Sequence, residues 1–168
     1  MRLNKNLKFI VFFLLSFILI LIDQYTKIFA KNNFKNNAFI IIKDVLELSY
    51  TENTGAAFGI MKEQFVIFYI ITFIVIIFII YILFKTDFNK KYLPLIICLL
   101  LIFSGSIGNL IDRIRNNYVI DFIYFKIIDF PLFNLADSYI TIGAFLIIYL
   151  FIFVYKEEDF NYVFKSRQ

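Results

Sequence analysis

The sequence predicts an all-α polytopic membrane protein, with four transmembrane helices and a little β-structure in the segments that join them outside the cytoplasm. Three observations predict this fold class. The chain of 168 residues is 61% hydrophobic, with a mean hydropathy of +0.81, whereas soluble domains are roughly 45–50% apolar. Its uncharged runs are long enough to cross a bilayer. Polar residues gather at the ends of those runs.

Four apolar runs mark the predicted spans. Backbone groups in lipid must find hydrogen-bond partners within the segment, so each run is predicted to be helical. Pro94 lies near the start of the third run, where a helix tolerates proline. We expect one integral-membrane domain over residues 1–168, with spans at about 9–30, 65–84, 92–112 and 137–155.

The first run has some features of a secretory signal peptide, because the basic residues Arg2, Lys5 and Lys8 precede it. No small-x-small cleavage site follows the run cleanly, however, and Asp23 and Lys27 stand where cleavage would occur. We therefore interpret the run as a retained first span.

Basic residues predict the orientation in the membrane. Nine of them lie in short segments on one face, and eight are spread over longer loops on the other. The positive-inside rule then places both termini in the cytoplasm. The net charge of +4 fits such anchoring and does not indicate nucleic-acid binding. The nine residues are Arg2, Lys5, Lys8, Lys85, Lys90, Lys91, Lys156, Lys165 and Arg167.

The absence of histidine restricts the possible chemistry. The chain has no His, and its one Cys, Cys98, lies in the middle of a span. A Ser-His-Asp triad, a Cys-His pair, a His-ligated zinc and a disulfide framework are therefore excluded. Any catalysis must use Asp, Glu, Lys or Ser, and no feature indicates a metal or organic cofactor.

The two long segments on the outer side are predicted to contain short strands. Within residues 31–63, "VLELSYTEN" alternates apolar and polar residues, as a half-buried strand does, and turn-forming "TENTGAAFG" follows. The second segment, "RNNYVIDFIYFKIIDFPLFN", is too aromatic and β-branched for a solvated loop. We expect short strands or a platform that lies on the outer membrane surface.

Polar residues at the span ends are expected to converge. Successive spans run in opposite directions, so the end of the first, the end of the third and the start of the fourth share one level. Asp23, Asn109 and Asp137 mark these three places. Ionisable groups at membrane depth cost about 2.5–3.5 kcal/mol each on insertion scales, so their gathering indicates a shared site.

Each of these elements also has a purely structural interpretation, which the sequence leaves open. These interpretations are an ion pair between Asp23 and Lys27, an ion pair of Asp112 with Arg113 or Arg115, a helix cap at Asn134, and close helix packing at Gly105 and Gly108.

Asp121 is the residue that points most directly to chemistry. No basic residue lies within four positions of it in "NNYVIDFIYF", so its pKa should be raised unless the fold supplies a partner. Asp137 is the natural candidate. Two carboxylates that share a site can activate water and protonate a leaving amine without His or metal. Spacing alone leaves Asp112 open as an alternative to Asp121.

Five ordered motifs, interleaved with the four spans, resemble those of lipoprotein signal peptidase, also called signal peptidase II, the membrane aspartic protease family of bacteria. The resemblance covers nearly the whole chain. It rests on "DQYTK" (residues 23–27), "NTGAAF" (53–58), "GNLIDR" (108–113), "VIDFI" (119–123) and "FNLAD" (133–137).

The resemblance implies a role for each matched residue. It puts the catalytic dyad on Asp121 and Asp137 and makes Asp112 a supporting residue. It also implies a small extracytoplasmic β-cradle over the site, and a covering loop after "NTGAAF". The residues implied to bind substrate or support the site are Asn53, Gly55, Asn109, Asp112, Arg113, Asn134, Asp23 and Lys27.

The implied substrate is a prolipoprotein whose lipobox Cys carries a diacylglyceryl group, cut just before that Cys. The resemblance further suggests a monomer in the bacterial cytoplasmic membrane, in contact with lipid, with its site near the outer face. Two alternatives remain from the residues themselves. One is a small proton-coupled transporter or transporter subunit, because intramembrane Asp and Lys also build proton relays. The other is a non-catalytic membrane scaffold.

Overall fold

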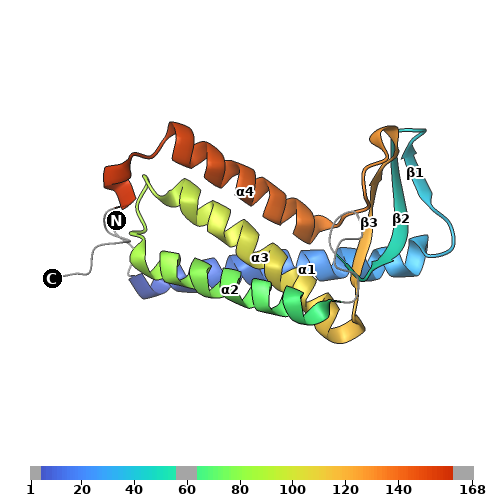
Figure 1. The fold of residues 1–168 in the computed structure, drawn as a ribbon, viewed down its shortest axis with the longest axis horizontal. Helices are drawn as coiled ribbons and strands as arrows, with labels where there is room; N and C mark the ends of the chain where they lie inside the picture. Colours follow the sequence, from blue (N-terminus) through green and yellow to red (C-terminus); the bar gives the residue numbers. More distant parts are fainter. Residues whose placement is uncertain (1–4, 56–63, 161–168) are drawn as a thin grey trace.

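Four long helices form the body of the protein, and a small sheet lies at one end of them (Figure 1). The computed structural model describes residues 5–55 and 64–160. Each of the four helices is long and apolar enough to cross a membrane, which confirms the predicted fold class. The helices are α1 (Lys5–Phe34), α2 (Phe65–Lys85), α3 (Leu93–Asn116) and α4 (Leu135–Phe153), and two 3-10 helices, η2 (Lys126–Ile128) and η3 (Glu157–Phe160), follow β3 and α4.

The third helix is the centre of the bundle. It packs against α1, α2 and α4, and half of its apolar window is buried, compared with 11–17% for the other three helices. Two glycines allow α4 to approach it closely. A Cβ atom on Gly105 would lie 2.4 Å from the backbone oxygen of Ala136, and one on Gly143 would lie 3.0 Å from that of Cys98. The predicted packing role of Gly105 is thus confirmed.

Local sequence explains where α3 and α4 begin and end. Pro94 stands in the first turn of α3, where a missing N–H costs nothing. The helix ends at Asn117, which has a left-handed backbone with φ of 59°, a conformation that Asn tolerates. At the start of α4, Asn134 and Asp137 form a reciprocal capping box. The predicted cap at Asn134 is confirmed.

The sheet has three antiparallel strands in the order β1-β2-β3. They are β1 (Phe39–Ile42), β2 (Leu46–Asn53) and β3 (Val119–Phe125). The strands predicted in both outer segments are therefore present as β2 and β3. The first five residues of β2 are all partly buried, and Lys126 contacts one of them, Glu47, with an Nζ–Oε1 distance of 2.7 Å.

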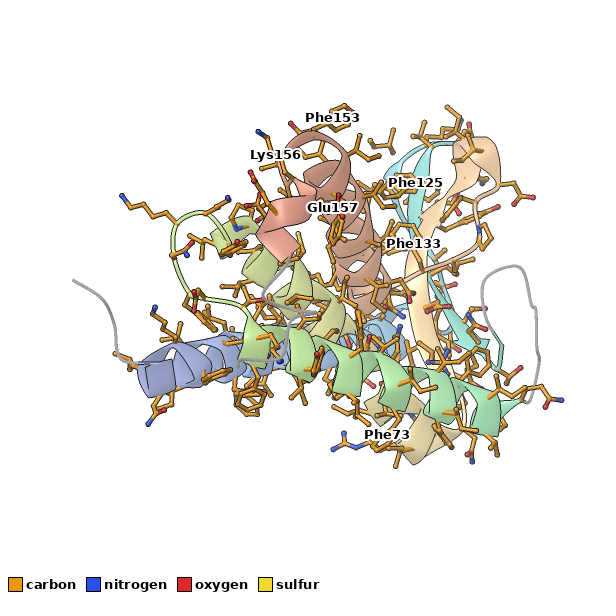
Figure 2. All side chains as sticks on the ribbon, turned by 60° about the vertical axis from the view of Figure 1, so that its left-hand side comes forward. Phe73, Phe125, Phe133, Phe153, Lys156 and Glu157 are labelled. Atoms are coloured by element: carbon orange, nitrogen blue, oxygen red, sulfur yellow. The ribbon has the colours of Figure 1, made fainter. Side chains whose placement is uncertain are left out.

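The register of the sheet positions the polar residues. Thr51 of β2 pairs with Asp121 of β3, and Asn53 pairs with Val119. Side chains two residues apart on a strand share a face, so Asn53 is the diagonal neighbour of Asp121. Beyond β3, Phe133 forms an isolated bridge with Ile123, and its ring stacks on Phe125 at 5.6 Å between centroids (Figure 2). These contacts attach the start of α4 to the sheet.

Candidate active site

The structure brings the polar residues that the sequence singled out to one level, where α1, α3 and the start of α4 meet the sheet. Asp23 and Lys27 come from α1, and Asn53 and Gly55 from β2 and the residues just after it. The third helix supplies Asn109, Asp112 and Arg113; β3 supplies Asp121; and Asn134 and Asp137 open α4.

Asp121 is almost fully buried, with 1% of its surface exposed. The Nδ2 of Asn53 donates to its Oδ2 at 2.8 Å, and the Nδ2 of Asn134 donates to its Oδ1 at 2.7 Å. Burial, and next the negative charge of Asp137, raise the pKa of Asp121 to about 7. The two amide hydrogen bonds favour the ionised form and hold the pKa back. The raised pKa expected from the sequence is thus present.

Asp137 is held by a different pair of donors. The Nδ2 of Asn109 donates to its Oδ1 at 2.7 Å. The backbone N–H of Asn134 donates to its Oδ2 at 3.1 Å, and the backbone N–H of Asp137 donates back to Oδ1 of Asn134 at 2.9 Å. The capping box therefore starts α4 and also fixes the side-chain conformation of Asp137.

Two carboxamides join the two carboxylates. The Nδ2 of Asn134 contacts Oδ1 of Asp121 and, at 3.2 Å, also Oδ1 of Asn109. Asn109 in turn donates to Asp137. Asn134 has no exposed surface and Asn109 is 6% exposed, so both amides are constrained by their surroundings. The arrangement holds Asp121 and Asp137 in one hydrogen-bonded network.

A buried ion cluster lies behind this network. The ammonium of Lys27 is 2.8 Å from Oδ2 of Asp23, 3.1 Å from Oδ2 of Asp112 and 3.0 Å from Oδ1 of Asn109. All three charged side chains are at most 3% exposed. Lys27 is the cation shared by both carboxylates, so removing it would leave two buried negative charges uncompensated. The Asp23–Lys27 ion pair predicted from the spacing is confirmed.

The suggested ion pair of Asp112 with Arg113 or Arg115 is wrong. Asp112 pairs with Lys27, and its oxygens also accept hydrogen bonds from the Gln24 side chain at 2.9 Å and from the Ile120 backbone at 3.2 Å. The physical reason is direction, because Asp112 faces inward, 2% exposed, towards α1. Arg113 instead lies over the Phe68 ring, 4.4 Å from its centroid, and donates to the Gly55 oxygen at 3.4 Å.

Gln24 is a residue that reasoning from the sequence missed. Its Nε2 contacts Asp112, the backbone oxygen of Gly108 at 3.2 Å and Asp23 at 3.3 Å. It thus joins α1 to α3 beside the ion cluster. The sequence signal that could have identified Gln24 was its position within the motif "DQYTK". Gly108 is equally constrained, since a Cβ atom there would lie 2.5 Å from Oδ2 of Asp23.

A cavity of about 480 Å³ opens at Asp121 and Asp137. Its volume is within the range of about 300–1,000 Å³ that is usual for ligand sites. Its lining combines polar side chains, among them Asn53, Asn109 and Arg113, with apolar ones, among them residues 130–133, Ile140 and Ile142. The covering loop expected after "NTGAAF", and residues 56–58 of that motif, lie outside the described residues.

Comparison with known proteins agrees with this arrangement. The family model described as signal peptidase (SPase) II matches residues 15–153. A lipoprotein signal peptidase from Clostridium tetani is 42% identical over 146 residues, covering 84% of this chain and 90% of the relative. Another, from Caldanaerobacter subterraneus subsp. tengcongensis, is 43% identical over 136 residues, covering 80% of this chain and 90% of the relative.

A solved structure agrees in three dimensions. It is described as a bacterial membrane enzyme determined by the in meso method at 2.3 Å resolution, and it is 33% identical to this chain with a TM-score of 0.74. The match covers 94% of this chain and 93% of the other. From this fold, this polar network and these matches, the chain belongs to the signal peptidase II family.

Proposed function

We propose that the chain is an aspartic endopeptidase that removes the signal peptide from prolipoproteins, with Asp121 and Asp137 as the catalytic dyad. One observation carries the proposal. Two carboxylates from separate elements line the same cavity and belong to one hydrogen-bonded network. The family supplies the peptidase activity, and without His the chain has no imidazole base. The comparisons do not support the transporter alternative.

The mechanism is an attack by water. With a pKa of about 7, Asp121 retains a proton at neutral pH on much of the protein and can act as the acid, and we assign the role of base to Asp137. Asp137 accepts a proton from water as the water oxygen attacks the scissile carbonyl, and Asp121 donates its proton to the carbonyl oxygen, which gives a gem-diol. As the C–N bond breaks, Asp137 gives its proton to the leaving amine and Asp121 takes a proton back from a gem-diol hydroxyl, which restores both carboxyl groups. Arg113, at the same cavity, is placed to stabilise developing negative charge.

The substrate we propose is a prolipoprotein whose lipobox Cys carries a diacylglyceryl group, cut just before that Cys. The mixture of polar and apolar side chains that line the cavity supports this choice. A peptide backbone needs hydrogen-bond donors and acceptors, which Asn53 and Asn109 supply, whereas acyl chains need apolar surface. Phe130, Leu132 and Ile142 supply that surface at the same cavity.

The remaining parts of the proposal concern the whole chain. We propose that residues 1–168 form one peptidase domain that acts as a monomer in the bacterial cytoplasmic membrane, in contact with lipids. Both termini would be cytoplasmic and the site near the outer face. The support is the charge asymmetry of the sequence, together with the position of the site at the sheet end of the bundle (Figure 1).

A cleavage assay tests the proposal. Purified protein in detergent meets a diacylglyceryl-modified prolipoprotein, and the mobility shift of the product is followed. Asp121→Asn and Asp137→Asn should each abolish cleavage while the protein still folds. Asp129→Asn is the matched control, because Asp129 is exposed beside η2 and its carboxylate contacts Tyr124. Full activity in either dyad variant would contradict the assignment, and a structural scaffold would lose stability without losing a chemical step.

A further inference from the structure

A second cavity, which we call the α1–α3 groove, lies at the end of the bundle away from the sheet. Its volume is about 650 Å³, again within the usual range for ligand sites. Its walls are alkyl and aromatic side chains from two helices. These are Val11, Phe12 and Leu15 of α1, and Leu93, Ile97 and Leu100 of α3.

The groove is separate from the peptidase site. Leu100 lines the groove and Asn109 lines the active-site cavity. Asn109 is nine positions after Leu100, which is two and a half turns of α3 at 3.6 residues per turn, so the two side chains point to opposite faces of the helix. The groove is also at the other end of the bundle, next to the α2–α3 connection (Figure 1). A ligand there would not occupy the peptidase site.

Two lysines stand at the mouth of the groove. Lys8 of α1 and Lys90 of the α2–α3 connection line it together with one carboxylate, Asp87. Within residues 5–55 and 64–160, neither ammonium lies within 4.0 Å of a carboxylate, unlike Lys91, which pairs with Asp159. The mouth is therefore basic on balance.

The position of Lys8 is fixed. Its Nζ donates to the backbone oxygen of Phe88 and lies 5.6 Å from the centre of that ring. Phe9, the next residue, packs on Phe84 at 4.8 Å and on Phe88 at 5.4 Å between centroids. These contacts attach α1 to the end of α2 and to the α2–α3 connection, so they hold the Lys8 ammonium in place at the mouth of the groove.

We propose that the α1–α3 groove binds one anionic phospholipid from the leaflet at that end of the bundle. An acyl chain lies along the apolar wall, where Val11, Leu93 and Ile97 are 41–52% exposed, and the phosphate lies between Lys8 and Lys90. Basic pockets between transmembrane helices are a recurrent way of binding anionic headgroups. A zwitterionic lipid fits less well, because its own ammonium would offset the attraction of the two lysines.

Native mass spectrometry of the full chain in detergent tests the proposal, with phosphatidylglycerol and phosphatidylcholine of identical acyl chains as probes. We expect tighter binding of phosphatidylglycerol. The double variant Lys8→Gln/Lys90→Gln should weaken its binding about fivefold for each lysine and leave phosphatidylcholine unchanged. Leu15→Trp, which fills the groove, should reduce the binding of both lipids. Prolipoprotein cleavage should persist in all variants, because the groove is remote from the dyad.

The matched control is Lys85→Gln/Lys156→Gln, which removes the same charge from residues outside the groove lining. It should keep the preference for phosphatidylglycerol. Equal binding of the two lipids by the unaltered protein would overturn the proposal without the need for any variant. So would equal loss in the control, which would indicate a general surface attraction, or full phosphatidylglycerol binding in Lys8→Gln/Lys90→Gln.

Discussion

The ammonium of Lys27 lies 3.0 Å from Oδ1 of Asn109, 82 positions further along the chain, and this contact fixes the orientation of the amide. An ammonium has only donors, so the carbonyl oxygen of Asn109 must face it. The NH₂ group must then face Asp137, 2.7 Å away. The contact with Lys27 thus makes Asn109 present its NH₂ group, and not its oxygen, to Asp137.

Asn109→Asp should therefore impair the chemical step more than folding. The variant keeps an acceptor for Lys27 but replaces the donor to Asp137 by a third carboxylate. A hydrogen bond to a charged group is worth about 1.5–3 kcal/mol, so kcat should fall roughly 10- to 100-fold. Single-turnover cleavage measures the change. An unaltered kcat would show that Asp137 does not need this donor.

The pH profile should report the proton on Asp121. Its pKa is raised to about 7, so the carboxyl is protonated below that pH and ionised above it. If Asp121 acts as the acid, kcat should fall as the pH rises through about 7. Asn53→Ala removes a hydrogen bond that lowers this pKa, and the alkaline limb should then move to higher pH. Movement to lower pH would refute the role given to Asp121.

Asp112→Asn should lower the stability of the protein without abolishing cleavage, because Asp112 is expected to support the site and not to take part in the reaction. The substitution leaves Lys27 and Asp23 as the only charges of the buried cluster and weakens the contact with Gln24. The Lys27–Asp23 pair remains, but the charge-assisted contacts of Asp112 are lost, and a hydrogen bond to a charged group is worth about 1.5–3 kcal/mol. The thermal midpoint should therefore fall while the folded fraction still cleaves substrate. Thermal unfolding in detergent, read beside cleavage, distinguishes the two effects. Complete loss of cleavage in a variant of unaltered stability would move the dyad to Asp112.

Gly108→Ala should destabilise the junction of α1 and α3. The new Cβ would lie 2.5 Å from Oδ2 of Asp23 and 3.3 Å from Cβ of Ala136. Relief requires a shift of Asp23, which also accepts from the Ala136 backbone at 3.0 Å. Overpacking typically costs about 1–3 kcal/mol. Ser106→Ala, on the same helix, adds no atoms and serves as the control; equal thermal midpoints for the two variants would show that α3 can shift freely.

Local patterns account for the parts of the fold that could be predicted. Span length, lack of charge and the β-branched run around Asp121 are properties of short segments, and they identified the four helices and two of the three strands. The first strand, residues 39–42, was not singled out. It is short, all four side chains are exposed, and it exists as a strand because it pairs with β2.

The candidate site, too, could be predicted only in part from the sequence. Alternating helix directions, read from the sequence, placed Asp23, Asn109 and Asp137 at one level. The choice of Asp121 over Asp112 as the proposed partner of Asp137 did not follow from spacing and came from resemblance to a family motif. The buried network adds geometric support for Asp121, because Asn134 reaches both Asp121 and Asn109.

Only the tertiary structure decided which residues pair with Asp112. The sequence suggested its immediate neighbour Arg113 for Asp112, but the fold pairs Asp112 with Lys27 and Gln24 of α1. Composition and periodicity determine that a segment is a helix and which end is polar. The facing partner depends on how α1 and α3 are rotated and how closely Gly108 lets them approach, and packing of the whole bundle sets both.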